Sequence, residues 1–159
     1  MDKQSIRTLI LKADRNELIE YLNSCLEQMT GEQLDWVFGD VYYEQVIQKL
    51  PATLVLTQIK KFLEDSIAGK YYAPFNMNSK NYTWIPPETN AWYSELSTWL
   101  DRSCELIEQG HQQIGKQCLD ICFQLIDKQG DDATVFAHEL GDWMIHAKYD
   151  YVAIYKRLK

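Results

Sequence analysis

Apolar residues recur along this chain with the spacing of an α-helix. Between Asp14 and Met29 they fall three and four residues apart, which places them on one face of a helix. The same spacing continues through most of the chain, and no alternation of apolar and polar residues indicates a β-strand. The pattern therefore predicts an all-α protein with about six to eight antiparallel helices.

Capping residues and helix breakers divide this pattern into separate helices. Asp14 with Glu17, and Thr30 with Gln33, have the spacing of a capping box. Glycines at 69 and 110 suit the position just after a helix. Helices are expected over residues 5–12, 14–29, 30–41, 52–68, 88–109, 111–129 and 132–158, with a separate helical piece over 42–50 that ends or turns at Pro51.

Two expectations concern the C-terminal half. The helix over 111–129 has the widest apolar face, so we expect it to be the central, most buried helix. The last helix should run unbroken from a cap at Asp131 or Asp132 to Leu158, because its apolar stripe stays in phase through Gly141. The whole chain is expected to form one domain over 1–159, with N-terminal helices over 5–68 and C-terminal helices over 88–158. Either an irregular bundle or a short HEAT-like array fits this series.

An aromatic connector, residues 69–87, separates the two halves. Lys80 is its only charged residue between Tyr71 and Pro87. Flexible linkers that pack against nothing contain few aromatic residues, so we expect this aromatic connector to be ordered. Three interpretations of the connector are open. In the first, the side chains of Phe75, Trp84 and Ile85 fill a groove between the two halves. In the second, exposed rings bind another protein or an extended peptide, and in the third they line a small-molecule pocket. The candidate binding residues are Tyr71, Tyr72, Tyr82 and Trp84.

One stretch partly matches the zinc-protease motif H-E-x-x-H. His138 and Glu139 are present, but Asp142 replaces the second histidine, and His146 follows one turn later. In the motif, histidines one turn apart bind zinc and the glutamate activates water. His138, Asp142 and His146 would share one face of the expected helix. Because the apolar stripe takes the core-facing side, we interpret these residues as a solvated flank and assign no metal, cofactor or catalytic residue.

The four cysteines all lie in apolar helical patterns. Cys118 and Cys122 are one turn apart, and together with Cys104 and His111 they could form a metal site. Structural zinc sites usually pair cysteines on turns, whereas a cysteine among isoleucines and leucines behaves as a small hydrophobe. We therefore expect free, buried thiols at all four positions, which include Cys25.

Charge narrows the range of partners. The chain has 16 basic and 23 acidic residues, which give a net charge of −7. Nucleic-acid binding needs clustered Lys and Arg, so we expect no direct contact with nucleic acid. No apolar run of 18 residues is present, and the first residues lack the pattern of a signal peptide. We expect a cytoplasmic protein with no membrane span.

A weak resemblance covers residues 82–127. The chain there reads Y-x-W-I-P, then a long helix ending LIEQG and another ending CFQLID. This pattern resembles segments of uncharacterised bacterial all-helical repeat families, which implies a bacterial all-α domain and carries no catalytic motif. The leading hypothesis is a non-enzymatic protein–protein interaction module, a subunit or adaptor of a larger bacterial assembly. The alternatives are an immunity or antitoxin protein whose acidic surface binds a basic toxin, and a metal-dependent hydrolase that uses the degenerate H-E-x-x-D helix.

Overall fold

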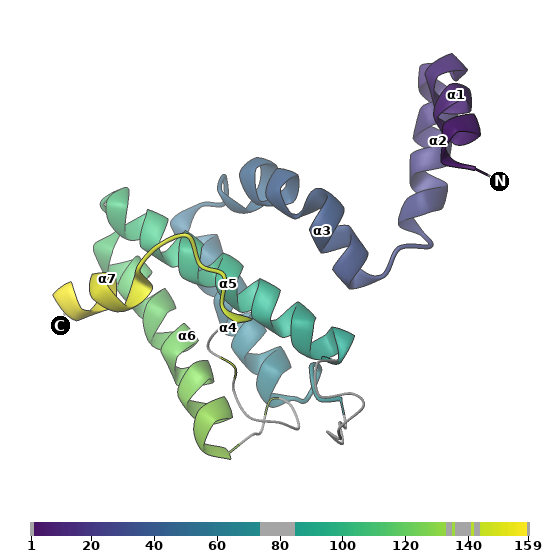
Figure 1. The fold of residues 1–159 in the computed structure, drawn as a ribbon. Coiled ribbons are helices and arrows are strands. Elements are labelled where there is room, and N and C mark those ends of the chain that lie inside the picture. Colours follow the sequence, from purple (N-terminus) through teal and green to yellow (C-terminus); the bar gives the residue numbers. More distant parts are fainter. Residues whose placement is uncertain (1, 74–84, 133–134, 136–140, 142–143, 159) are drawn as a thin grey trace.

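The computed structural model describes residues 2–73, 85–132, 135, 141 and 144–158. These residues form seven α-helices and no strand, so the prediction of an all-α fold is confirmed (Figure 1). Within this described part, no helix combines the length and apolar character needed to cross a lipid bilayer. The helices are α1 (Lys3–Lys12), α2 (Arg15–Leu26), α3 (Gly31–Tyr42), α4 (Ala52–Ile67), α5 (Pro87–Glu108), α6 (Gln112–Asp132) and α7 (Tyr151–Arg157).

The helix ends follow the predicted capping signals. The Asp14 carboxylate accepts the N–H of Glu17 at 3.0 Å, and the Glu17 carboxylate accepts the N–H of Asp14 at 2.8 Å. A second capping box joins Thr30 and Gln33. Gly69 closes α4 with a φ of +84°, in the left-handed region where a side chain would be strained.

The segment after α3 is not a separate helical piece. A π-helical turn, η1 (Tyr43–Ile47), continues α3 directly, and its wider winding places the side chains of Tyr43 and Ile47 in the core. The N–H of Gln48 donates to the carbonyl of Tyr43 at 2.8 Å, the i+5 spacing of a π turn. The helix ends before Pro51, because the residue before a proline disfavours the helical conformation.

The centre of the molecule is α5, and the prediction that the helix over 111–129 is central was wrong. Helices α3, α4, α6 and α7 all contact α5 (Figure 1). Its buried side chains include polar ones, such as Asp101 and Arg102, as well as Trp92 and Leu96. The prediction ranked the helices by their apolar residues alone. In the structure these polar residues of α5 are buried as well, because other segments of the chain cover them.

Close approach of α6 to α5 depends on Gly115. A Cβ atom at this position would lie 2.6 Å from Ile107 Cγ1 and 2.9 Å from the carbonyl oxygen of Ser103. A hydrogen in place of a side chain lets the two backbones come together. The three residues between α5 and α6 require the two helices to run antiparallel.

The prediction of one unbroken helix from residue 132 to Leu158 was wrong. Gly141 and residues 145–150 are not helical, and α7 begins only at Tyr151. Instead, residues 144–149 follow α5 as an irregular strap. The apolar residues of this segment recur with helical spacing, yet the backbone of residues 145–150 is not helical.

Side chains of α5 supply the hydrogen bonds that a helix would otherwise make. The N–H of His146 donates to Ser97 Oγ at 2.9 Å, and the N–H of Lys148 donates to Asp101 Oδ1 at 2.6 Å. A third N–H, of Gly141, donates to the hydroxyl of Tyr93 at 2.7 Å. These acceptors are spaced one turn apart on α5, so one helix face holds the whole strap. Burial raises the pKa of Asp101, although the two backbone N–H groups it accepts act in the opposite direction.

Candidate binding groove

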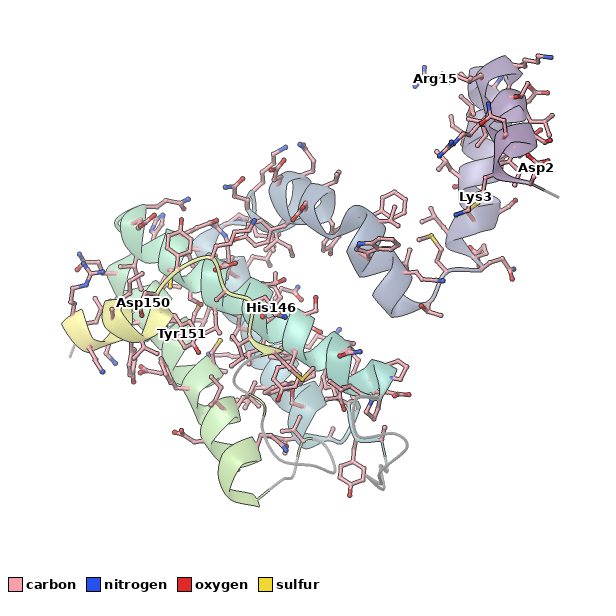
Figure 2. The ribbon with its side chains drawn as sticks, viewed as in Figure 1. Asp2, Lys3, Arg15, His146, Asp150 and Tyr151 are labelled. Atoms are coloured by element: carbon pink, nitrogen blue, oxygen red, sulfur yellow. The ribbon has the colours of Figure 1, made fainter. Side chains whose placement is uncertain are left out.

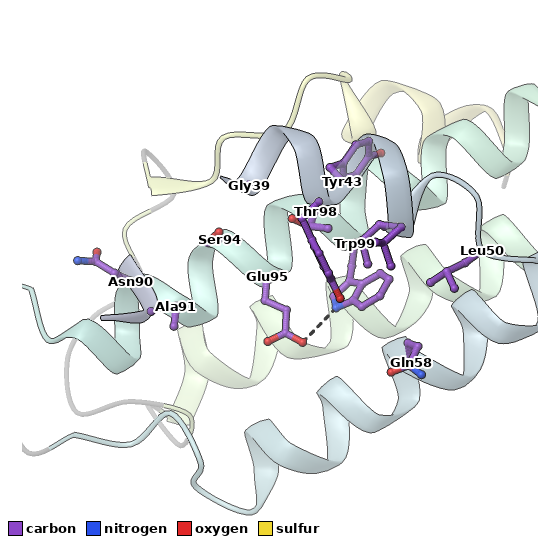
Figure 3. Close-up of a pocket in the computed structure, with 14 residues that line it drawn as sticks. Gly39, Tyr43, Leu50, Gln58, Asn90, Ala91, Ser94, Glu95, Thr98 and Trp99 are labelled. Carbon is purple, nitrogen blue, oxygen red and sulfur yellow. Dashed lines mark hydrogen bonds between the residues drawn. The ribbon is translucent and has the colours of Figure 1, made fainter. Parts of the chain in front are cut away.

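Helix α3 and the turn η1 cross α5 and leave a groove between them. Its volume is about 600 Å³, within the usual range for binding sites in proteins (Figure 3). Helices α3, α4 and α5 and the turn η1 all contribute to it. The lining residues are Gly31, Gly39, Tyr42, Tyr43, Val46, Ile47, Leu50, Gln58, Asn90, Ala91, Ser94, Glu95, Thr98 and Trp99.

The groove has an apolar side and a polar side. Tyr43, Val46 and Trp99 give aromatic and aliphatic surface, while α5 presents the short polar side chains of Ser94 and Thr98. Glu95 lies between them and accepts the indole N–H of Trp99 at 3.4 Å (Figure 3). This combination of apolar surface with a few fixed polar groups is typical of recognition sites.

A second hollow, of about 510 Å³, lies beside the first and shares several of its residues. Gly39, Tyr43 and Ser94 line both hollows, so the two are neighbours around α3. Trp36 and Lys148 line the second hollow only. The binding groove, meaning both hollows together, therefore extends from η1 to the C-terminal strap.

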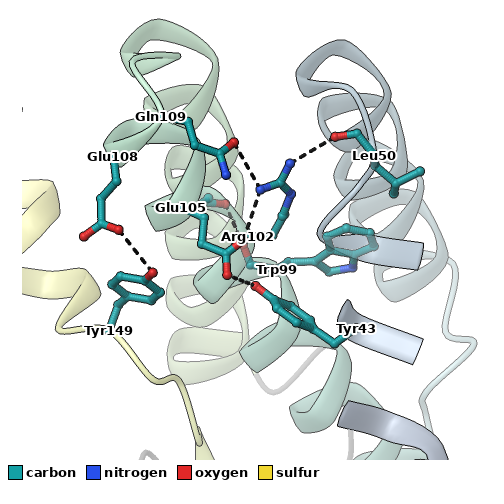
Figure 4. Close-up of polar contacts among 9 residues, drawn as sticks. Tyr43, Leu50, Trp99, Arg102, Glu105, Glu108, Gln109 and Tyr149 are labelled. Atoms are coloured by element: carbon teal, nitrogen blue, oxygen red, sulfur yellow. Dashed lines mark hydrogen bonds and ion pairs between the residues drawn. The ribbon is translucent and has the colours of Figure 1, made fainter. Parts of the chain in front are cut away.

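A buried polar network holds η1 against α5. The hydroxyl of Tyr43 donates to Glu105 Oε1 at 2.8 Å, and the guanidinium of Arg102 donates to Glu105 Oε2 at 3.0 Å (Figure 4). The same guanidinium donates to the carbonyl of Leu50 at 3.0 Å. Burial raises the pKa of Tyr43, and the neighbouring Glu105 carboxylate adds to the shift, so Tyr43 stays neutral and keeps its proton to donate. The network fixes one wall of the groove.

Exposed apolar side chains of α3 lie in the groove and beside it. Trp36 is 88% exposed, the largest value among the large hydrophobic residues of the described part of the chain. Val37, Val41 and Tyr42 on the same helix are each more than half exposed. Large exposed apolar surface marks sites of interaction with proteins or other ligands.

The candidate binding residues of the connector that the structure describes, Tyr71 and Tyr72, differ in burial. Tyr71 is buried: its ring meets Phe62 edge to face with centroids 5.7 Å apart, and its hydroxyl donates to Glu95. Tyr72 is 49% exposed and presents its ring to solvent. Tyr82 and Trp84 lie outside the described residues. The described end of the connector therefore contains one packed ring and one exposed ring.

The low-ranked candidate metal site would need His146 on the same helix face as His138 and Asp142. Residues 145–150 are not helical, so His146 does not lie one helical turn beyond position 142. His138 and Asp142 lie outside the described residues. Among the described residues, no three His, Cys, Asp or Glu side chains come together in a way that could hold a metal ion.

The cysteines are all free, and three are buried as predicted. Burial raises the pKa of Cys104 to about 12 and that of Cys118 to about 11, so both stay as unreactive thiols at neutral pH. Cys122 is also fully buried. Cys25 is exposed, against the prediction, because nothing in the described part of the chain covers the apolar face of α2.

Sequence reasoning missed the groove, because its residues come from segments far apart in the chain. Tyr43 and Glu105 meet although 62 residues separate them. One signal was available: Trp36 lies two residues from both Leu34 and Phe38, so it is on the opposite side of the helix from these partly buried residues. An aromatic residue on that opposite side marks exposed surface that could serve recognition.

Comparison with models of protein families, with curated proteins and with solved structures finds no match to this chain. The resemblance to bacterial helical-repeat families stays a prediction. The groove and the surface around it are the features that bear on function.

Proposed function

We propose that this protein is a non-enzymatic interaction module, an adaptor or subunit that binds a segment of another protein in the groove around α3. The observation that carries the proposal is the groove itself, bordered by the exposed ring of Trp36. Aromatic side chains that border a groove are favoured anchors of protein interfaces, because they bring a large contact area with few rotatable bonds.

The extent of the apolar surface favours a protein over a small molecule. A small ligand would fill a hollow of about 600 Å³ and still leave Trp36, Val37 and Val41 in water. A peptide segment or a helix face covers such a surface together with the groove beside it. The apolar wall formed by Tyr43 and Trp99 would receive its apolar side chains.

The charge around the groove favours a segment with basic residues. Asp40, Glu95 and Asp101 line the groove, and Lys148 is the one cationic side chain among its lining residues. Carboxylates attract a basic segment and reject an acidic one, which gives selectivity even where the net gain in affinity is small. A basic toxin bound by an immunity protein belongs to this class of partner, as does a basic segment within a larger assembly.

A pull-down from the native host compares three proteins: the unaltered chain, Trp36→Ala and Tyr72→Ala. Both substitutions remove an exposed aromatic ring, at 88% and 49% exposure, so neither should disturb folding. The proposal expects Trp36→Ala to lose partners that the other two proteins retain. With the purified partner, calorimetry should show binding at least about tenfold weaker for Trp36→Ala.

Other outcomes would indicate a different binding site or a different function. Loss of partners with Tyr72→Ala alone would place the site on the aromatic connector. If all three proteins recover the same partners, the groove has no part in binding. Stoichiometric metal in the purified protein that disappears with His146→Ala would favour the hydrolase instead.

A further inference from the structure

The helices α1 and α2 leave their apolar faces in water. They are joined by Ala13 and Asp14, and neither contains a buried residue (Figure 2). Helices of 10 and 12 residues are marginal in water unless an apolar face is packed. We call α1 and α2 the helix pair. Its exposed large hydrophobic residues are Ile6, Leu9, Ile10, Leu11, Ile19, Tyr21, Leu22 and Leu26.

The helix pair differs from the rest of the chain in charge. Residues 1–29 contain four basic and five acidic residues, a net charge of −1. Residues 30–159 contain twelve basic and eighteen acidic residues, a net charge of −6. Repulsion keeps strongly acidic surfaces of two copies apart, but it is nearly absent at the helix pair.

The charges within the pair are also separated. Helix α1 has three basic residues and no acidic one, whereas α2 with its C-cap Glu27 has three acidic residues and one basic residue. No ion pair among the described residues includes a residue of α1 or α2. In a two-fold arrangement that sets α1 of one copy beside α2 of the other, the basic helix meets the acidic helix twice.

We infer that the helix pair docks against the helix pair of a second copy of this chain and forms a four-helix bundle. Such a bundle buries the apolar stripes of all four helices in a common core, which two helices alone cannot do. This inference uses a different surface from the binding groove and does not rest on the proposed function.

The exposed area suits a dimer of ordinary size. A large aliphatic side chain exposes on the order of 100 Å² when bare. The eight exposed side chains, each about half in water, therefore offer on the order of 400 Å² of apolar surface per copy. Because about 60% of such an interface is apolar, the total is roughly 700 Å² per copy, close to the typical value of about 800 Å².

A basic toxin is a poorer occupant for this surface. The excess acidic charge that would attract such a toxin lies in residues 30–159 rather than on the helix pair. A nearly neutral, apolar face with separated charges complements itself better than it complements a strongly charged protein. A chain that stays monomeric would leave this surface to a different apolar partner.

Sedimentation equilibrium of the full chain tests the inference between about 1 and 100 μM. We expect twice the chain mass of 18.7 kDa at the upper end of this range. The double variant Leu9→Glu, Leu22→Glu places carboxylates in the apolar stripes and should weaken association at least about tenfold. The control Leu54→Glu adds a carboxylate to a 43% exposed position in the first turn of α4, and its association should match that of the unaltered chain.

The reactivity of Cys25 tests the same contact in the unaltered protein. This thiol is exposed on the same stripe of α2 as Leu22, whereas Cys104, Cys118 and Cys122 are buried. Its alkylation rate should fall as the protein concentration rises, because the second copy covers it. This measurement holds even if the double variant fails to fold.

Four results would overturn the inference. A chain that stays monomeric across the whole range rules out the dimer. A dimer that survives in the double variant, or one that the control also loses, uses another surface. Alkylation of Cys25 at a rate independent of concentration shows that the helix pair stays uncovered, so that its partner is not a second copy.

Discussion

The sequence alone gives no sign that Arg102 and Glu105 are buried. Both are charged, yet the side chain of Arg102 is only 3% exposed and that of Glu105 only 11%. They are buried where Tyr43 and Leu50, from segments distant in sequence, hydrogen-bond to them, although Nε of Arg102 has no partner. A charge in the interior is tolerated only when it is paired and hydrogen-bonded. Their burial therefore depends on contacts that a linear pattern does not contain.

Removal of Arg102 should destabilise the fold strongly. In Arg102→Ala the Glu105 carboxylate stays buried without its cation, which typically costs about 3–5 kcal/mol. The control is Lys116→Ala, which breaks the pair Lys116–Asp120 whose side chains are 37% and 42% exposed, and it should cost less than about 1 kcal/mol. Urea denaturation measures both values. Equal small losses would mean that the buried pair contributes little to stability.

At the scale of elements, local signals predicted most helices well. The capping boxes at Asp14 and Thr30, and the glycine ends at Gly69 and Gly110, act within one or two turns, so their sequence alone defines them. The strap over 144–149 shows the opposite case. Its backbone pairs with Ser97 and Asp101 of α5 rather than with itself, a choice that depends on a helix more than 40 residues away.

The packing of α5 against α6 should be sensitive to one methyl group. Gly115→Ala places a Cβ where Ile107 Cγ1 and the Ser103 carbonyl leave only 2.6 and 2.9 Å, so the helices must separate. We expect a loss of about 1–3 kcal/mol in thermal or urea unfolding. The matched control Gly31→Ala meets nothing within 4 Å and should be neutral or stabilising by less than about 1 kcal/mol. Similar effects at both glycines would contradict the close contact.

At the scale of the molecule, burial is uneven along the chain. Helices α5 and α6 contain the most buried apolar residues, among them Trp92 and Leu119, and α4 contacts both of them. The helices α1 and α2 contain none and lie at one end of the molecule (Figure 1). Local stability follows buried contacts, so the two regions should open with different free energies.

Amide hydrogen exchange followed by mass spectrometry measures this difference. In dilute solution, peptides from α1 and α2 should exchange at least about 100-fold faster than peptides from α4 and α5. Peptides from α6 serve as an internal reference, because Leu119 and Leu125 are fully buried. Equal protection of all these helices at low concentration would mean that α1 and α2 are covered within the single chain.

The sequence by itself determined the helical class, most helix boundaries and the burial of three of the four cysteines. These properties depend on periodicity and capping, which act between residues only a few positions apart. Tertiary structure alone decided that α5 is central, that the last predicted helix gives way to a strap, and that Tyr43, Arg102 and Glu105 form one wall of a groove. Each of these results requires polar groups distant in sequence to satisfy one another's hydrogen bonds, and only the folded chain brings such groups together.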